Sequence, residues 1–156
     1  MAIAKASKLT VILLTVAALA VALTTIAAIT VNQSVSSSGT ITAGPNVGVY
    51  SNSACTNAIT SINWGSIEVG NSASYTIYIE DTGGAQMAPS ITIGAISPST
   101  AAAYVTITMT SPTSLPSEIQ PGAANALAVT FTVTVSSSTP SSVTSFSNTI
   151  TISGTG

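Results

Sequence analysis

The sequence has almost no charged side chains and no histidine. Only two of its 156 residues are Lys or Arg and only four are Asp or Glu, whereas about a quarter of a typical soluble domain is charged. Both basic residues, Lys5 and Lys8, lie at the N-terminus, so residues 9–156 contain four carboxylates and no basic group. A groove that binds nucleic acid needs Lys or Arg to neutralise phosphates, so we expect no nucleic-acid partner.

The same absences argue against an enzyme. General acid–base catalysis uses side chains that titrate near neutral pH, or carboxylates held as a pair. Residues 9–156 have no His or Lys, and the sequence has no G-x-S-x-G nucleophile motif, no phosphate-binding loop and no Cys- or His-based metal motif. We therefore predict no catalytic residue, no cofactor, no metal and no small-molecule substrate.

Two adjacent carboxylates, Glu80 and Asp81, precede a predicted turn at residues 82–84. Neighbouring residues of a strand point to opposite faces, so this pair is not catalytic unless the turn rearranges it. A turn with two carboxylates can hold Ca²⁺ through oxygen ligands. We interpret both side chains instead as solvated turn residues.

One cysteine and one tryptophan are present. Cys55 cannot form a disulfide within the chain; it could couple two subunits, but we interpret it as a small, semi-buried residue. Trp64 is predicted to plug the core or one end of the β domain, in preference to serving as a ligand platform.

The surface polarity comes from 25 Ser and 25 Thr residues and not from charged side chains, so we expect a hydrated surface with little net charge.

The N-terminal part contains one long apolar run. After a short basic leader, residues 1–8, the segment 9–31 has no charged residue, no Gly and no Pro. A helix of this length spans about 35 Å, enough to cross a bilayer core of about 30 Å. Ala20, Thr24 and Ala28 at four-residue spacing favour close helix–helix packing. We predict one long apolar α-helix that lies in a membrane or in a filament core.

Three interpretations of this run are open: a cleaved secretory signal peptide, a permanent membrane anchor, or a pilin-type helix that leaves the membrane for a filament. Small residues such as Ala27 and Ala28 could provide the cleavage site of a signal peptide. The next residues, 32–39, are predicted to be a polar joint. Asn32-Gln33-Ser34 makes Asn32 a possible N-glycosylation site within this joint.

From residue 40 to residue 156 the pattern changes to period two. The clearest run alternates Val129, Phe131 and Val133 with Thr130 and Thr132, so one face is apolar and the other carries hydroxyl groups. Such alternation is typical of antiparallel strands with one face on a core and one in water. We predict a mostly β fold, an immunoglobulin-like antiparallel β-sandwich of seven or eight strands preceded by the apolar helix. Similar runs begin near Tyr75, Ala103 and Phe146.

The leader, the apolar run and the charge-poor β domain together resemble archaeal type IV-like pilins and archaellins. Lys5-Ala6 followed by Ser7 is similar to the leader-peptidase motif of that family, which implies cleavage after Ala6. Lys8 departs from the family pattern, because the mature helix usually starts apolar. Val11 stands where many bacterial pilins have a glutamate, which archaeal members often lack.

Residues 47–152 also resemble a small archaeal surface domain. The resemblance implies surface display and a structural role. Its pattern consists of Tyr50 with Cys55, the segment Ile62-Asn63-Trp64-Gly65, the turn Gly83-Gly84, and Pro121-Gly122 before the longest strand.

A third resemblance is to TasA-type biofilm fibres, whose subunits donate an N-terminal strand to the next subunit after signal-peptide cleavage. Residues 29–43 could be such a strand. The large apolar side chains of this segment are Ile29, Val31, Val35 and Ile41.

We therefore expect an extracellular structural subunit of a pilus-like filament. Its partners are copies of itself joined through the N-terminal helix, and the membrane before assembly. The expected location is extracellular or at the cell surface, with a membrane-inserted precursor. The alternatives are a membrane-anchored, monomeric adhesion or spacer domain and a strand-donating fibre subunit.

Overall fold

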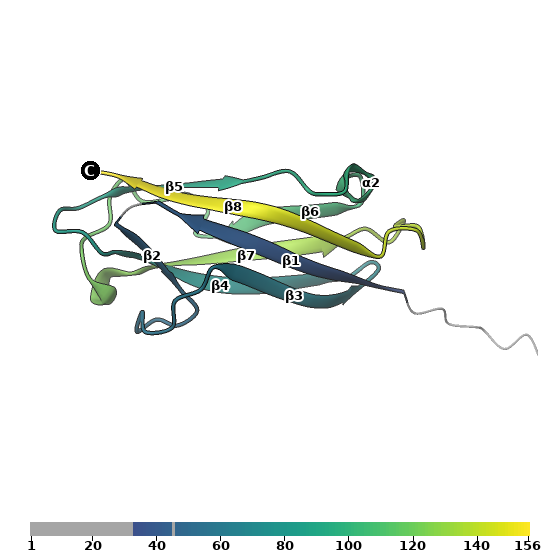
Figure 1. Cartoon of the computed structure of the whole chain (residues 1–156), viewed down its shortest axis with the longest axis horizontal. Coiled ribbons are helices and arrows are strands. Elements are labelled where there is room, and N and C mark those ends of the chain that lie inside the picture. The colour runs from purple at the N-terminus through teal and green to yellow at the C-terminus, as the bar shows by residue number, and fades with distance from the viewer. Residues whose placement is uncertain (1–32, 45) are drawn as a thin grey trace, which may run out of the picture. The chain divides into compact units, whose positions relative to one another are not determined.

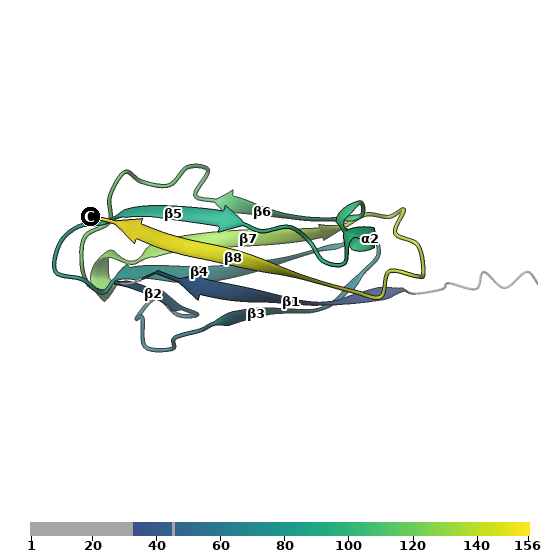
Figure 2. The same cartoon turned by 45° about the horizontal axis from the view of Figure 1, so that its top comes forward.

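The computed structural model describes residues 33–44 and 46–156. The predicted leader, the apolar segment 9–31 and Asn32 lie outside the described residues. Eight strands form two four-stranded sheets, and Figures 1 and 2 show them as two layers. One sheet has the order β3-β1-β8-β5, with β3 Ser61–Glu68, β1 Ser34–Ala43, β8 Ser145–Thr155 and β5 Ala88–Ile93. The other has the order β2-β4-β7-β6, with β2 Val47–Tyr50, β4 Ser72–Asp81, β7 Leu127–Val135 and β6 Val105–Ser111.

The core lies between the two sheets and is built by the alternation seen in the sequence. In β7, Val129, Phe131 and Val133 are fully buried, and Thr130 and Thr132 are half-exposed on the other face. The register predicted for this strand is therefore confirmed. Ile77 and Ile79 of the neighbouring strand β4 belong to the same core. The facing sheet contributes Ile62 of β3 and Ile150 and Ile152 of β8.

Trp64 of β3 is part of this core. Its side chain is only 7% exposed. Its ring meets the ring of Tyr75 edge-on, with centroids 6.4 Å apart and an interplanar angle of 77°, a favourable arrangement for two aromatic rings. Trp64 thus links the two sheets, as the prediction of a core plug requires.

The predicted fold class needs two corrections. Among the described residues there is no long N-terminal helix: helical structure is limited to α2, Ser99–Ala102, and the 3₁₀ turn η1, Ala123–Asn125. The sandwich is also not purely antiparallel, because β1 pairs in parallel with β8. These are the first and last strands, and the whole sandwich serves as the long connection that parallel neighbours need.

The predicted polar joint at residues 32–39 is also corrected. Most of it is the first half of β1, which lies between β3 and β8 and pairs with both. Val35 and Ile41 face the core, together with Ser37 and Gly39, while the residues between them are exposed. Ser37 and Gly39 are small enough to pack against the facing sheet. The segment can therefore form a central strand although most of its residues are polar.

A smaller correction concerns the strand predicted from Ala103. Residues 99–102 form α2, and β6 begins only at Val105. Ala103 is exposed at the end of the helix, while Val105 is buried. Ala103 and Tyr104 form the turn that follows this helix, so the strand starts two residues later than alternation alone predicts.

No helix in the described part of the chain is both long and apolar enough to cross a membrane. The expected membrane-inserted precursor concerns residues 9–31, which lie outside that part.

Candidate functional site

The outer face of the β2-β4-β7-β6 sheet carries a ladder of paired hydroxyl groups. β4 and β7 are antiparallel, and their outward residues stand directly opposite one another. The ladder continues onto β6, where the hydroxyl oxygen of Thr110 lies 3.1 Å from that of Thr132. The pairs satisfy polar groups without charge, so these hydrogen bonds do not depend on a titrating group. Three pairs join hydroxyl oxygens at 2.8–3.0 Å: Ser72 with Thr134, Ser74 with Thr132, and Thr76 with Thr130.

One side of the sandwich is open between β5 and β6. Each is the last strand of its sheet, and in both views they lie along the same upper side of the sandwich (Figures 1 and 2). Ile93, Ile96 and Ile107 are half-buried there, against the core. We call this the β5/β6 groove: a surface cavity of about 440 Å³ lined by Ile93, Gly94, Ala95, Ile96, Ala102, Thr106, Ile107 and Thr108.

On the opposite side, the loop between β2 and β3 lies along the edge of β2. This loop folds back on β2: the Ile59 N–H donates to the Val49 carbonyl at 2.9 Å, and Tyr50 bridges to Ala58. Asn52 fixes the loop, because its side-chain carbonyl accepts from the Asn57 N–H at 3.0 Å. In the described part of the chain, the β5/β6 side carries an apolar groove, and the β2 edge is paired with its own loop.

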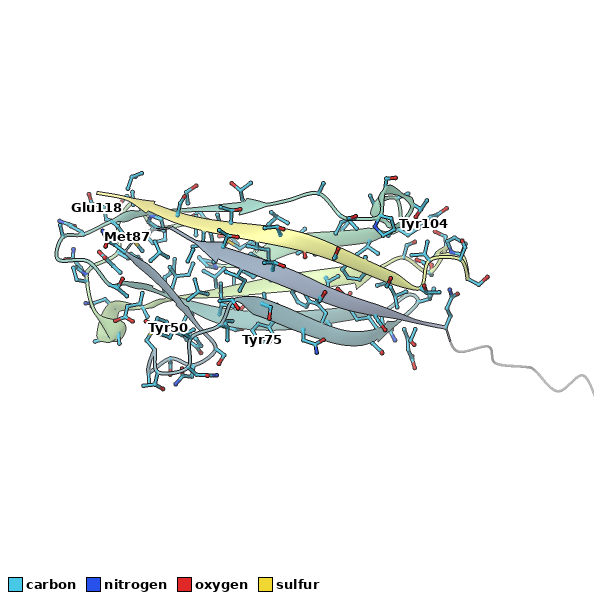
Figure 3. The ribbon with its side chains drawn as sticks, in the orientation of Figure 1. Tyr50, Tyr75, Met87, Tyr104 and Glu118 are labelled. Atoms are coloured by element: carbon cyan, nitrogen blue, oxygen red, sulfur yellow. The ribbon has the colours of Figure 1, made fainter. Side chains whose placement is uncertain are left out.

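The carboxylates Glu80 and Asp81 point to different environments. Glu80 is half-buried and faces Tyr50 and Cys55 (Figure 3 labels Tyr50). Burial raises the pKa of the Cys55 thiol, and the negative charge of Glu80 and a hydrogen bond to it raise that pKa further. Burial likewise raises the pKa of Tyr50, with the Glu80 hydrogen bond and charge adding to the effect.

Cys55 is consequently expected to react slowly with iodoacetamide. The thiolate is the nucleophile, so a raised pKa lowers the reactive fraction near pH 8.5 below that of a free cysteine. Glu80→Gln removes the charge and should speed alkylation, whereas Glu68→Gln, on another strand, should not. Alkylation rates followed by mass spectrometry check this; an unchanged rate in Glu80→Gln would contradict the role given to Glu80.

Asp81 corrects the prediction of two solvated turn carboxylates. Its side chain is 1% exposed. One oxygen, Oδ1, accepts from the Gly83 N–H at 2.8 Å, and the other, Oδ2, is buried with no hydrogen-bond partner among the described residues. The sequence indicated this position, because Asp81 is two residues after Ile79 and four after Ile77, and alternate residues of a strand point to the same face. A cavity of about 280 Å³ adjoins it, lined by Asn46, Asp81, Gly83, Gly84, Ala85, Gln86, Met87, Gly154 and Gly156 (Figure 3 labels Met87).

A second group of buried polar atoms lies under β1. Asn148 of β8 is 6% exposed, and neither its side-chain amide nor the indole N–H of Trp64 has a hydrogen-bond partner in the described part of the chain. Gly39 lies over both. A Cβ at that position would come within 3.1 Å of Asn148 Oδ1 and 3.4 Å of Trp64 Nε1. Gly39 therefore gives these two side chains the room that they need, which is a packing role.

The other residues singled out from the sequence are not placed together. Lys5, Ala6 and Ser7 of the leader motif and the sequon residue Asn32 lie outside the described residues. Across residues 33–44 and 46–156, no three His, Cys, Asp or Glu side chains come together in a way that could hold a metal ion.

Comparison with known proteins gives no family for the chain: no protein-family model matches the sequence, and no curated protein matches it. The features that bear on function are therefore the hydroxyl ladder, the β5/β6 groove and the apolar segment 9–31.

Proposed function

We propose that the protein is a structural subunit of an extracellular filament, joined to its neighbours through the apolar N-terminal segment 9–31. Its partners are copies of the same chain, and the hydroxyl-covered sandwich forms the outer wall. Processing after Ala6, an archaeal cell surface and a glycan on Asn32 belong to the same proposal. The observation that carries it is the β5/β6 groove, an apolar site at the edge of a sandwich whose sheet faces are hydroxyl-rich.

The apolar side chains of segment 9–31 must be buried away from water. The segment contains twelve Val, Ile and Leu residues. Full burial of one such side chain is worth about 1.5–3 kcal/mol, so exposing all of them to water costs on the order of 20 kcal/mol. Two residues, Asn32 and Gln33, lie between the end of the segment and the start of β1 at Ser34. Every subunit therefore carries, next to its sandwich, a segment that must be buried elsewhere.

Two routes can bury it, and the groove favours one of them. Segments from many subunits can pack together in a filament core, or the end of one segment can enter the groove of the next subunit as an added strand. Such a strand would pair with an edge strand and place alternate side chains on the apolar groove floor. Ile29 and Val31 have the required spacing, and Ile93 and Ile107 are half-buried in the groove.

The predicted donor strand, residues 29–43, must be shortened for this route. Residues 34–43 are already β1 and are paired on both sides, with β3 and with β8. Donating them would break two sets of backbone hydrogen bonds within the subunit. Only residues before Ser34 are therefore offered to a neighbour.

Cross-linking in filaments sheared from cells tests the proposal. In a Cys55→Ser background, Val31→Cys combined with Ile107→Cys should give a ladder of covalent multimers after oxidation. The matched control, Val31→Cys with the outward-facing Thr134→Cys, should not. If the double variant gives no ladder and the single Val31→Cys variant gives dimers, the bundled-core route is favoured. Cells that display only monomeric, membrane-anchored chains would contradict the filament and favour the adhesion or spacer alternative.

A further inference from the structure

The buried carboxylate of Asp81 lacks a counter-charge. The side chain is 1% exposed, and Oδ2 has no hydrogen-bond partner among the described residues. No Lys, Arg or His follows Lys8 in the sequence, so the sandwich has no basic side chain to pair with it. A carboxylate removed from water is costly unless a cation or several donors compensate it. Here the one donor is the Gly83 N–H, and it serves the other oxygen.

The cavity beside Asp81 is lined by polar side chains and glycines, together with Ala85 and Met87. Its volume of about 280 Å³ exceeds the roughly 30 Å³ that one water occupies in the liquid, so an ion and several waters fit. Asn46 lies close to the carboxylate: a Cβ built on Gly83 would be 3.0 Å from Asp81 Oδ1 and 3.4 Å from Asn46 Cβ. The loop residues 83–86 also line the cavity, together with Met87, Gly154 and Gly156.

Three segments of the fold meet at this point. The Thr82 N–H donates to the Asn46 carbonyl at 2.9 Å, and the Gly122 N–H donates to the Asp81 carbonyl at 3.0 Å. Asp81 is also the last residue of β4 and pairs with Val47 of β2. A ligand held by the Asp81 side chain would therefore tie the start of β2, the end of β4 and the 83–86 loop together.

We propose that this cavity binds one Ca²⁺ ion, with the Asp81 carboxylate as its charged ligand. The side-chain oxygen of Asn46, carbonyl groups of the 83–86 loop and water supply the remaining oxygen ligands, while the side-chain oxygen of Gln86 accepts from the Gln120 amide at 2.9 Å. Carboxylate, amide and carbonyl oxygens suit a hard cation, and a site completed by water suits Ca²⁺ better than Mg²⁺, which demands a near-ideal octahedron. With a single carboxylate, the dissociation constant belongs in the weak range of extracellular calcium modules, about 10⁻⁴–10⁻³ M.

The test uses the full-length chain in mild detergent, after passage over a chelating resin. Adding 10 mM CaCl₂ is expected to raise the Tm by about 3–6 °C, because an ion that binds only the folded state stabilises it by mass action. Equilibrium dialysis should find one Ca²⁺ per chain. Asp81→Asn keeps the shape of the side chain and should lose both effects. Glu80→Gln, which removes the adjacent carboxylate that faces Tyr50, should keep them.

A second variant covers the case in which Asp81→Asn does not fold. Asn46→Asp adds a second carboxylate to the cavity and should tighten Ca²⁺ binding about tenfold, which dialysis measures directly. The proposal is overturned if the wild-type chain binds no Ca²⁺ and its Tm does not change. It is equally overturned if Asp81→Asn responds to Ca²⁺ as the wild type does, or if Glu80→Gln alone abolishes the response.

Discussion

Replacing Phe131 by alanine is expected to lower the free energy of unfolding by about 3–5 kcal/mol, the usual cost of removing a buried phenylalanine. Phe131 is fully buried in β7, a central strand. It stands opposite Tyr75 of β4 on one side and Met109 of β6 on the other. These neighbours are held in their own strands, so they can fill only part of the space that the ring leaves. Urea unfolding of residues 33–156, followed by Trp64 fluorescence, measures the loss.

The matched control for this change is Thr130→Ala, one residue earlier in the same strand. Thr130 is on the outer face, and its hydroxyl pairs with Thr76 at 2.8 Å in a part-buried position. Water can replace the lost partner, so the cost should stay below about 1 kcal/mol. Most domains are stable by only about 5–15 kcal/mol, so the two variants should differ clearly in their urea midpoints. Equal effects at the two positions would mean that the ring is not packed as described.

The parts of the fold that alternate strongly could be predicted from the sequence. β7 and β8 combine bulky apolar residues on one parity with hydroxyl residues on the other, and even the buried Asn148 falls on the inward parity. The signal is local, because a strand with one face in a core needs a period of two whatever its neighbours are. The two-layer arrangement follows, since each sheet must cover the apolar face of the other.

β1 could not be predicted in full, because its strand character depends on its neighbours. Residues 36–39 are Ser-Ser-Ser-Gly, which alone indicate a flexible joint. They are a strand because β3 and β8 pair with them on both sides, and strand preference depends strongly on such context. The parallel pairing of β1 with β8 is equally non-local, since no pattern in either segment specifies its partner.

The candidate sites divide in the same way. The hydroxyl surface is visible in composition, since Ser and Thr greatly outnumber charged residues. The β5/β6 groove exists because the strand order leaves those two strands at the edges on one side, and strand order is a property of the whole chain. For Asp81, the alternation of the strand indicated an inward position, but aspartate side chains are exposed in nearly every protein. Its burial became visible only with the Gly83 hydrogen bond and the surrounding loop.

Deleting residues 9–31 is expected to abolish assembly and to leave a soluble, monomeric sandwich. The deletion removes all twelve Val, Ile and Leu side chains of the apolar segment, and with them burial worth on the order of 20 kcal/mol per subunit. The sandwich should survive, because residues from Val35 to Ile152 form its described core. Analytical ultracentrifugation and negative-stain microscopy measure the outcome directly.

The control for the deletion is a chain that keeps the segment's length and loses its apolar character. Replacing Val16, Val21 and Ile26 by aspartate places charges along the segment without changing the distance to β1. Both routes of assembly require an apolar segment, so this chain should behave like the deletion and remain monomeric. Filaments formed by the truncated sandwich alone would mean that contacts between sandwiches, and not the N-terminal segment, hold the subunits together. Filaments formed by the aspartate variant but not by the deletion would mean that the segment acts as a tether whose length matters and whose burial does not.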